Sequence, residues 1–249
     1  MSDKKDPIRP TTPEAVRLAK TLMRTARYGA IAVLDARTGR PLASRVAVAT
    51  DTDGTPLILI SGLAAHTPAL TANPACSLLL GEPGKGDPLA HPRITLHCDA
   101  VRIEKVGGEY PRIRRRYLAH NPKGALYADL GDFAFFRLNV TGASLNGGFG
   151  KAFILTMDDL VCPAQTAMRI AAQEEEMLRD INETRQAEIV QAMGPAAGTA
   201  KNRWKITGVD PDGLDLADGD HTARLFFPSP CQSAPEVLAA LPDVTAGAA

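Results

Sequence analysis

Residues 41–80 read PLASRVAVATDTDGTPLILISGLAAHTPALTANPACSLLL, and this stretch decides the fold. Two apolar runs, at 45–50 and 56–61, have the length and the composition of β-strands. The residues between them, Asp51-Thr52-Asp53-Gly54, have the composition of a tight hairpin turn. We therefore predict an antiparallel hairpin here, followed by a short helix and by a further strand that ends near Gly81.

Polar residues stand at the ends of these predicted elements. Ser44 and Arg45 open the first strand, and Ser61 closes the second. His66 and Thr67 begin the short helix. A cation, hydroxyl groups and free backbone N–H groups in such positions suit a phosphorylated cofactor. The same residues also fit a surface arginine, a capping threonine and an ordinary turn, so both interpretations stay open on spacing alone.

The rest of the first 156 residues continues the pattern of short strands. We predict a helix at Pro13–Thr25, where Thr12 suits the N-cap position and a proline suits the first turn. Further strands are predicted at 28–35, 75–81, 93–106, 132–138 and 141–148, with a helix at 109–120. Turns rather than full helices separate most of these strands, which favours an antiparallel barrel over a parallel sheet.

After about residue 156 the chain becomes rich in Ala, Gln, Glu and Arg. The predicted elements are one or two helices over 162–193, short strands at 203–209, 214–216 and 222–227, and a helical turn at 234–241. Gly194–Gly198 should interrupt the helical region, and the final VTAGAA should form a frayed tail. The predicted organisation is a flexible start at 1–12, a barrel domain at 13–156 and a small α/β domain at 157–245.

The overall composition excludes several classes of protein. The 28 basic and 28 acidic residues cancel, so there is no general attraction to nucleic acid or to an anionic membrane. No apolar run approaches the ~20 residues of a membrane span, and the polar start does not resemble a secretory signal. The four cysteines are far apart, so we expect neither disulfides nor a metal site, and we expect a cytoplasmic protein.

Three groups of charged residues have ordinary interpretations. The arginine-rich run at 112–116 is predicted to lie on a solvated helix face near acidic partners. The run Glu174-Glu175-Glu176 is likewise predicted to face solvent. The carboxylates between Asp210 and Asp218 follow turn spacing and lack the glycine and the terminal glutamate of a calcium loop.

Several motifs in this order resemble one known family. They are PLASRVAVATD, LISGLAAHTPALTANP and HPRITL, followed by RRRYLAHNPKGALYADLGDFAFFRL and NGGFGKAF. Together they resemble the flavin-binding split barrel of the pyridoxamine-phosphate-oxidase superfamily, in its haem-utilisation branch, over about residues 15–153. The resemblance implies an α+β fold, with an antiparallel six-stranded split β-barrel followed by a small α/β domain. It also implies a homodimer that holds FMN between its subunits.

The same resemblance implies a set of FMN-binding residues. Arg45 resembles the strand arginine that binds the phosphate, and His66 stands where many relatives have a phosphate-binding lysine. Arg93 falls where oxidase-type relatives carry a glutamine that contacts the flavin. The complete expected set is Ser44, Arg45, Val46, Ile60, Ser61, His66, Thr67, Arg93 and Phe149, the last in a glycine loop where it could stack on a planar ring.

The C-terminal segment also resembles the small domain fused to haem-utilisation barrels, with one departure. Relatives often carry a histidine-containing motif where this chain has INETR at Ile181–Arg185. Haem iron needs an axial donor, usually an imidazole. His221, in a polar turn, and His91, in the loop before Arg93, are the remaining candidates, and neither has supporting context in the sequence.

Three functions follow as expectations. The first is a flavin-dependent oxidoreductase that acts on a small-molecule substrate, with catalytic residues that the sequence does not identify. The alternative is haem binding or haem breakdown on the same scaffold. The third is a barrel that binds a flavin or another ligand without catalysis.

Overall fold

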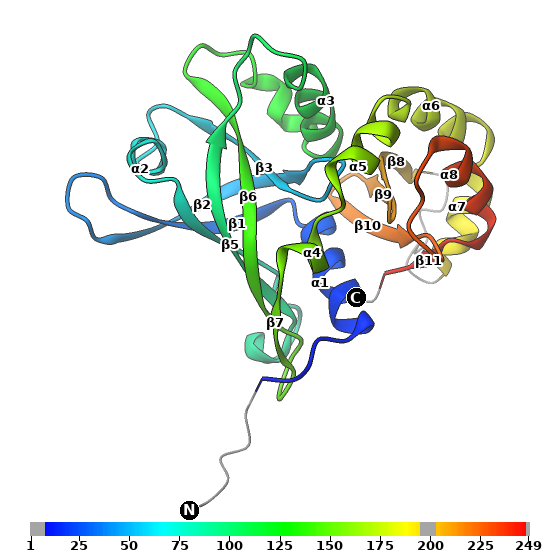
Figure 1. Ribbon diagram of the computed structural model, residues 1–249, viewed down its shortest axis with the longest axis horizontal. Coiled ribbons are helices and arrows are strands. Elements are labelled where there is room, and N and C mark those ends of the chain that lie inside the picture. Colours follow the sequence, from blue (N-terminus) through cyan, green and yellow to red (C-terminus); the bar gives the residue numbers. More distant parts are fainter. Residues whose placement is uncertain (1–7, 195–202, 248–249) are drawn as a thin grey trace, which may run out of the picture.

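The computed structural model describes residues 8–194 and 203–247. Predictions for residues 1–7, for most of the 194–198 break and for the last two residues lie outside this part. Among the described helices, none is long and apolar enough to cross a membrane. The chain forms a β-barrel, at the left of Figure 1, and a smaller α/β domain at its right.

The predicted antiparallel barrel is confirmed. Its strands are β1 (Tyr28–Leu34), β2 (Pro41–Thr50), β3 (Pro56–Ser61), β4 (Ala75–Leu80), β5 (Arg93–Arg102) and β6 (Phe133–Asn146). The strand order is β3-β2-β1-β4-β5-β6-β7, where β7 (Ala152–Leu155) is an extra strand. Pairing of β3 with β6 closes the barrel. Alternate apolar side chains such as Ile31, Val48 and Leu78 are fully buried in its interior.

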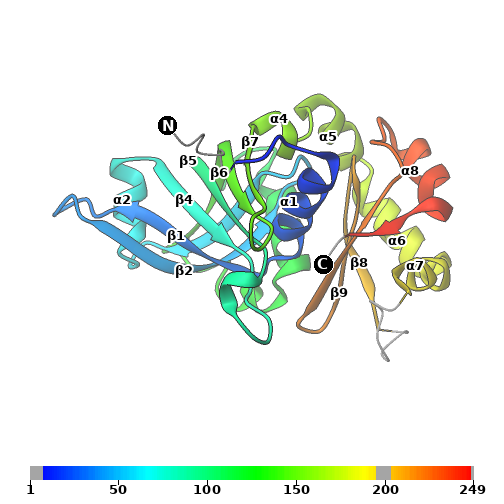
Figure 2. The same cartoon turned by 90° about the horizontal axis from the view of Figure 1, so that it is seen from below.

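Helices lie at the ends and on one side of the barrel. The helix α1 (Pro13–Thr25) begins as predicted, with the Thr12 hydroxyl accepting a hydrogen bond from the Ala15 N–H. The other helices of this part are α2 (His66–Ala72), α3 (Tyr110–His120) and two short 3-10 turns, Pro88–Ala90 and Pro122–Leu126. Figure 2 shows α1 between the barrel and the second sheet, so this helix belongs to the contact between the two parts.

The two strands predicted at 132–138 and 141–148 are one continuous strand, β6. The register between β5 and β6 shifts between His97 and Cys98, which leaves Thr141 as an extra residue in β6. A β-bulge of this kind absorbs one residue without ending the strand. The sequence pattern changes phase at that point, and this is why the strand looked interrupted.

The small domain contains a four-stranded antiparallel sheet in the order β11-β10-β9-β8. Its elements are α4 (Met157–Leu160), α5 (Ala164–Ala171), α6 (Glu174–Thr184), α7 (Gln186–Met193), β8 (Lys205–Asp210), β9 (Gly213–Asp218), β10 (His221–Phe226), α8 (Ala234–Ala240), a 3-10 turn (Leu241–Asp243) and β11 (Thr245–Ala246).

Two predictions for this domain are wrong. The region expected to hold one or two helices forms α5, α6 and α7, because the chain leaves the helical conformation at Gln173 and Arg185. The expected frayed tail includes β11, in which Thr245 pairs with Phe226. An unpaired strand edge on β10 provides the template for that short pairing.

Candidate functional site

The polar residues of the 41–80 stretch form hydrogen bonds with one another. His66 Nδ1 lies 3.1 Å from the Ser44 hydroxyl, and the Thr67 hydroxyl donates to the Ser61 carbonyl at 2.6 Å. The Ser61 hydroxyl donates to a carboxylate oxygen of Asp132 at 2.6 Å. We call these five residues the Ser61 cluster. The structure thus brings together four of the predicted FMN-binding residues and adds an acidic one.

The Ser61 cluster fits an FMN phosphate poorly as it stands. Its hydroxyl groups already have partners, and the Asp132 carboxylate would repel a phosphate. Burial lowers the pKa of His66, which disfavours the cationic imidazole in the ligand-free site, and its buried Nε2 atom has no hydrogen-bond partner among the described residues. Sequence reasoning missed Asp132, because it lies far along the chain from the other members and only the pairing of β3 with β6 brings it close.

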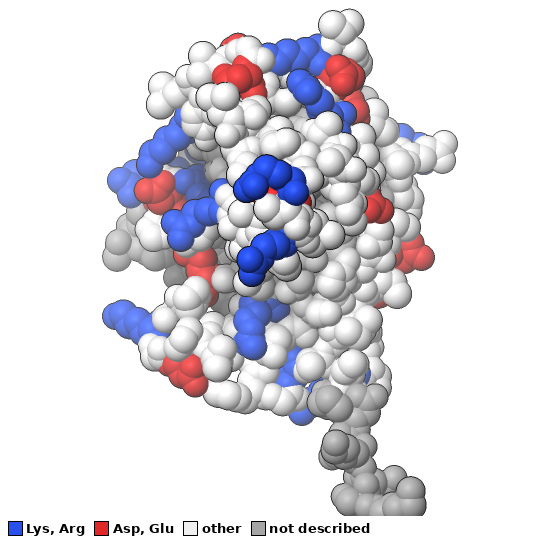
Figure 3. All heavy atoms as spheres, turned by 90° about the vertical axis from the view of Figure 1, so that its left-hand side faces the viewer, with Lys and Arg blue, Asp and Glu red and all other residues white. Residues whose placement is uncertain are grey.

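Arg45 lies apart from this cluster, on the outer face of β2. Its exposed guanidinium stands 5.3 Å from the centre of the Tyr28 ring. The register places Arg45 opposite Ala30 in β1, so Tyr28 is its diagonal neighbour. No ion pair with Arg45 occurs within the described residues. Figure 3 looks at the hairpin end of the barrel, where Lys and Arg side chains gather.

The other predicted FMN-binding residues do not join the Ser61 cluster. Val46 and Ile60 point into the barrel core. Arg93 donates hydrogen bonds to the carbonyls of Leu89 and His91, and so holds its own loop. Phe149 is exposed in the turn between β6 and β7.

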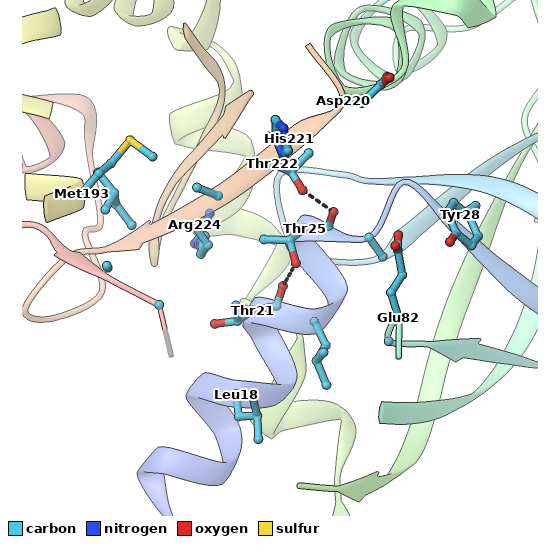
Figure 4. A pocket seen from close by; sticks show the side chains of 17 residues that line it. Leu18, Thr21, Thr25, Tyr28, Glu82, Met193, Asp220, His221, Thr222 and Arg224 are labelled. Carbon is cyan, nitrogen blue, oxygen red and sulfur yellow. Dashed lines mark hydrogen bonds between the residues drawn. The ribbon is translucent and has the colours of Figure 1, made fainter. Parts of the chain in front are cut away.

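A separate pocket of about 400 Å³ lies between the barrel and the small domain (Figure 4). Helix α1, the start of β1 and the turn after β4 supply one side, and β10 supplies the other. Its lining includes the partly buried apolar residues Leu18, Leu22 and Ala26, together with Tyr28, Glu82 and His221. We call it the interdomain pocket.

The hydroxyl groups in this pocket are used to hold its walls together. The Thr222 hydroxyl of β10 donates to the Thr25 carbonyl of α1 at 2.7 Å, and the Thr25 hydroxyl donates to the Thr21 carbonyl at 2.7 Å (Figure 4). Within the described residues, the His221 imidazole and the Glu82 carboxylate have no hydrogen-bond partner. The pocket therefore combines walls that hydrogen bonds join with an imidazole that has no hydrogen-bond partner among the described residues.

The two histidines predicted as candidate haem donors differ in this respect. His91 Nε2 lies 3.0 Å from the Lys85 carbonyl, which engages that ring nitrogen in the loop. His221 lies at the exposed start of β10 and lines the interdomain pocket. Tyr28 lines the same pocket, and its ring also contacts the Arg45 guanidinium. Arg45, on the outer face of the barrel, therefore lies beside this pocket. Sequence reasoning missed Tyr28, since only the register of β1 against β2 reveals it.

Charged residues beside the pocket are buried rather than solvated. Three arginines meet three carboxylates between the barrel and the small domain, and we call them the buried ion cluster: Arg24, Arg116, Arg224, Glu174, Asp210 and Asp215. The predicted solvated faces at 112–116 and 174–176 are therefore wrong for Arg116 and Glu174, which are 3% and 0% exposed. Each is buried because the other domain supplies the opposite charge.

The carboxylate of Asp210 stays ionised in this setting. Burial by itself would raise its pKa, but the guanidinium groups of Arg224 and Arg24 outweigh that effect and hold the pKa well below its usual range. Asp210 is completely buried, so its charge depends on these partners.

Known proteins share this architecture. The family model described as pyridoxamine 5'-phosphate oxidase matches residues 16–146. A protein of unknown function from Agrobacterium tumefaciens str. C58 has a solved structure that is 34% identical, with a TM-score of 0.80, and the match covers 95% of this chain and 98% of that one. A solved heme binding protein from Mycobacterium smegmatis is 26% identical, with a TM-score of 0.55 and coverage of 95% and 96%.

A curated relative matches a shorter part of the chain. The chloroplastic non-canonical heme oxygenase HOZ of Arabidopsis thaliana is 41% identical over 117 residues, which are 47% of this chain and 35% of that protein. The present chain thus spans about a third of the length of that relative. The two solved structures cover nearly the whole chain, the small domain included. The chain therefore belongs to the pyridoxamine 5'-phosphate oxidase family, with a split barrel that carries a small C-terminal domain.

Proposed function

We propose that this protein binds haem in the interdomain pocket, where His221 would supply a nitrogen donor to the iron. The observation that carries the proposal is a free imidazole at the edge of an apolar pocket, next to a barrel whose predicted phosphate-binding hydroxyls are already engaged. The heme binding protein from M. smegmatis matches both domains, which supports a role for the small domain in this function.

The residues of the pocket fit the chemistry of haem. Leu18, Leu22 and Ala26 would contact the apolar macrocycle, and His221 would supply a nitrogen ligand. Arg45, held against Tyr28 beside the pocket, would pair with a propionate.

Haem breakdown is the reaction that we propose to follow binding, because a relative that is 41% identical over 117 residues is named as a heme oxygenase. A bound haem supplies a redox-active iron. The residues of this chain would hold the ring, orient it through His221 and exclude water from its apolar face. FMN-dependent oxidation is the competing function, and it would require the Ser61 cluster to open.

Homodimerisation, with the cofactor near the subunit interface, is also a proposal. The outer face of β1, β2 and β4 carries small, exposed or half-buried side chains, among them Ala30, Ala32, Ala43 and Ser77. The same face also exposes the larger apolar side chains of Leu34 and Leu79, and an exposed apolar face suits contact with a second copy. Light scattering should give twice the 26.4 kDa of the chain, and a mass of one chain would contradict the dimer.

Absorbance titrations of the purified protein test the proposed function. We expect hemin to produce a saturable Soret band, and we expect His221→Ala to weaken hemin binding at least tenfold and to change the band. His91→Ala is the matched control and should bind like the wild type. Loss of the Soret band in the presence of ascorbate and O2 would report breakdown. Tight FMN binding without a His221-dependent hemin band would contradict the proposal, and bound haem that no reductant consumes would indicate a non-catalytic module.

A further inference from the structure

We infer that Arg24 and Arg224 are positioning residues that set the distance between the two walls of the interdomain pocket. They do so by sharing the carboxylates of Asp210 and Asp215. The inference rests on the proposed haem function of that pocket, and it adds residues that act on the ligand through the walls rather than by contact.

Arg24 connects the α1 wall to the rest of the molecule. Its Nη1 atom lies 3.3 Å from a carboxylate oxygen of Asp210 and 3.6 Å from one of Asp215, both in the small domain. The same nitrogen donates to the Asp51 carbonyl in the β2–β3 hairpin at 3.0 Å. The side chain is only 4% exposed. A single buried guanidinium thus ties α1, the barrel hairpin and the small domain together.

Arg224 connects the opposite wall to the same two carboxylates. Its Nη2 atom lies 2.7 Å from Asp210, and its Nη1 atom lies 2.8 Å from Asp215. The Arg224 side chain is fully buried, and the residue lies in β10, three positions after His221. Figure 4 shows Arg224 on the strand that also carries His221 and Thr222, opposite α1.

The shared carboxylates make the spacing of the walls rigid. If β10 moved away from α1, Asp210 and Asp215 could not keep both arginines paired, and a buried charge would lose its partner. Unpaired buried charges are costly, so the ion pairs resist that movement more strongly than apolar contacts would. Because the His221 nitrogen and the apolar surface of α1 must contact one flat ligand at the same time, this spacing determines how well the ligand fits.

The test compares Arg24→Met with Arg137→Met. Arg137 forms ion pairs with Asp51 and Asp53, which belong to the barrel domain. Among the described residues it makes no ion pair with the small domain, so its replacement controls for general destabilisation. We expect Arg24→Met to weaken hemin binding at least tenfold, to remove the His221-dependent form of the Soret band and to accelerate hydrogen exchange in β10. Arg137→Met should change neither the band nor the exchange of β10. Arg24→Lys keeps the positive charge but loses the two-nitrogen guanidinium. Its hemin affinity and β10 exchange should lie between those of Arg24→Met and the wild type.

Two results would overturn the inference. One is a folded Arg24→Met protein with wild-type hemin affinity, Soret band and β10 exchange, and the other is an equal loss in Arg137→Met. If Arg24→Met does not fold, Arg24→Lys decides by the same readouts. If the wild type shows no His221-dependent hemin band, the proposed function fails, and exchange of β10 decides the inference alone: faster exchange in the Arg24 variant supports it and unchanged exchange overturns it.

Discussion

The Ser61 cluster and the interdomain pocket use their polar groups in opposite ways. In the Ser61 cluster, the serine and threonine hydroxyls contact other residues of the chain, and the buried Nε2 atom of His66 has no hydrogen-bond partner among the described residues. In the pocket, hydrogen bonds and ion pairs hold the walls, while His221 and Glu82 stay free at the opening, as far as the described residues go. Polar residues near one another in sequence therefore need not form a binding site, because they can satisfy each other's hydrogen-bonding groups first.

The largest expected effect comes from removing a carboxylate of the buried ion cluster. Asp210→Ala would leave Arg24 and Arg224 short of a partner, and we expect it to lower the free energy of unfolding by about 3–5 kcal/mol. Urea unfolding measures this value. Asp129→Ala removes the exposed carboxylate that pairs with the half-buried Arg114 and should cost less than about 1 kcal/mol. Equal losses in the two variants would show that the interdomain ion pairs do not stabilise the contact.

The second prediction concerns the contribution of the Arg45 guanidinium to hemin binding. Arg45→Met removes the cation beside Tyr28 and should weaken hemin binding about tenfold, the loss of roughly one charge-assisted contact. Arg40→Met, in the exposed hairpin turn, is the matched control and should leave hemin affinity unchanged. Tighter or unaltered hemin binding in Arg45→Met would show that Arg45 does not contact the ligand.

Acid should weaken the fold through buried histidines, His66 of the Ser61 cluster among them. Burial lowers the pKa of His66 in the folded protein, whereas in the unfolded chain an imidazole has a pKa of about 6.5. The unfolded state therefore binds more protons, and stability is present above about pH 6.5 and decreases as the pH falls through and below that value. Unfolding measured between pH 8 and pH 5 should show a shallower decrease for His66→Gln.

The smallest expected effect is that of Ser61 itself. Ser61→Ala removes a hydroxyl that donates to Asp132 and accepts from the Leu63 N–H, so stability should fall by about 1 kcal/mol. Hemin binding should not change. A clear loss of FMN affinity in this variant would restore the Ser61 cluster as a phosphate site and would reverse the comparison.

Much of the fold and part of the site could be predicted from local sequence. Alternation of apolar residues predicted the barrel strands, and the Thr12-Pro13 pair predicted the start of α1. Arg45 and His221 were among the predicted ligand-binding residues, and both lie at or beside the interdomain pocket. Their connection through Tyr28 could not be predicted, because it depends on the register of β1 against β2 and on the position of β10 against α1.

Local sequence is enough to specify the barrel, because the two-residue period of a half-buried strand is a property that each segment carries alone. It also determined which residues can bind a cation, an anion or a metal, because that chemistry belongs to the side chain. Only the tertiary structure decided which of them are available. Four charged residues look like surface residues in the sequence: Arg24, Arg116, Glu174 and Asp210. Packing of the two domains buries each of them beside a residue of opposite charge. Burial depends on what the other half of the chain supplies, so neighbouring residues do not encode it.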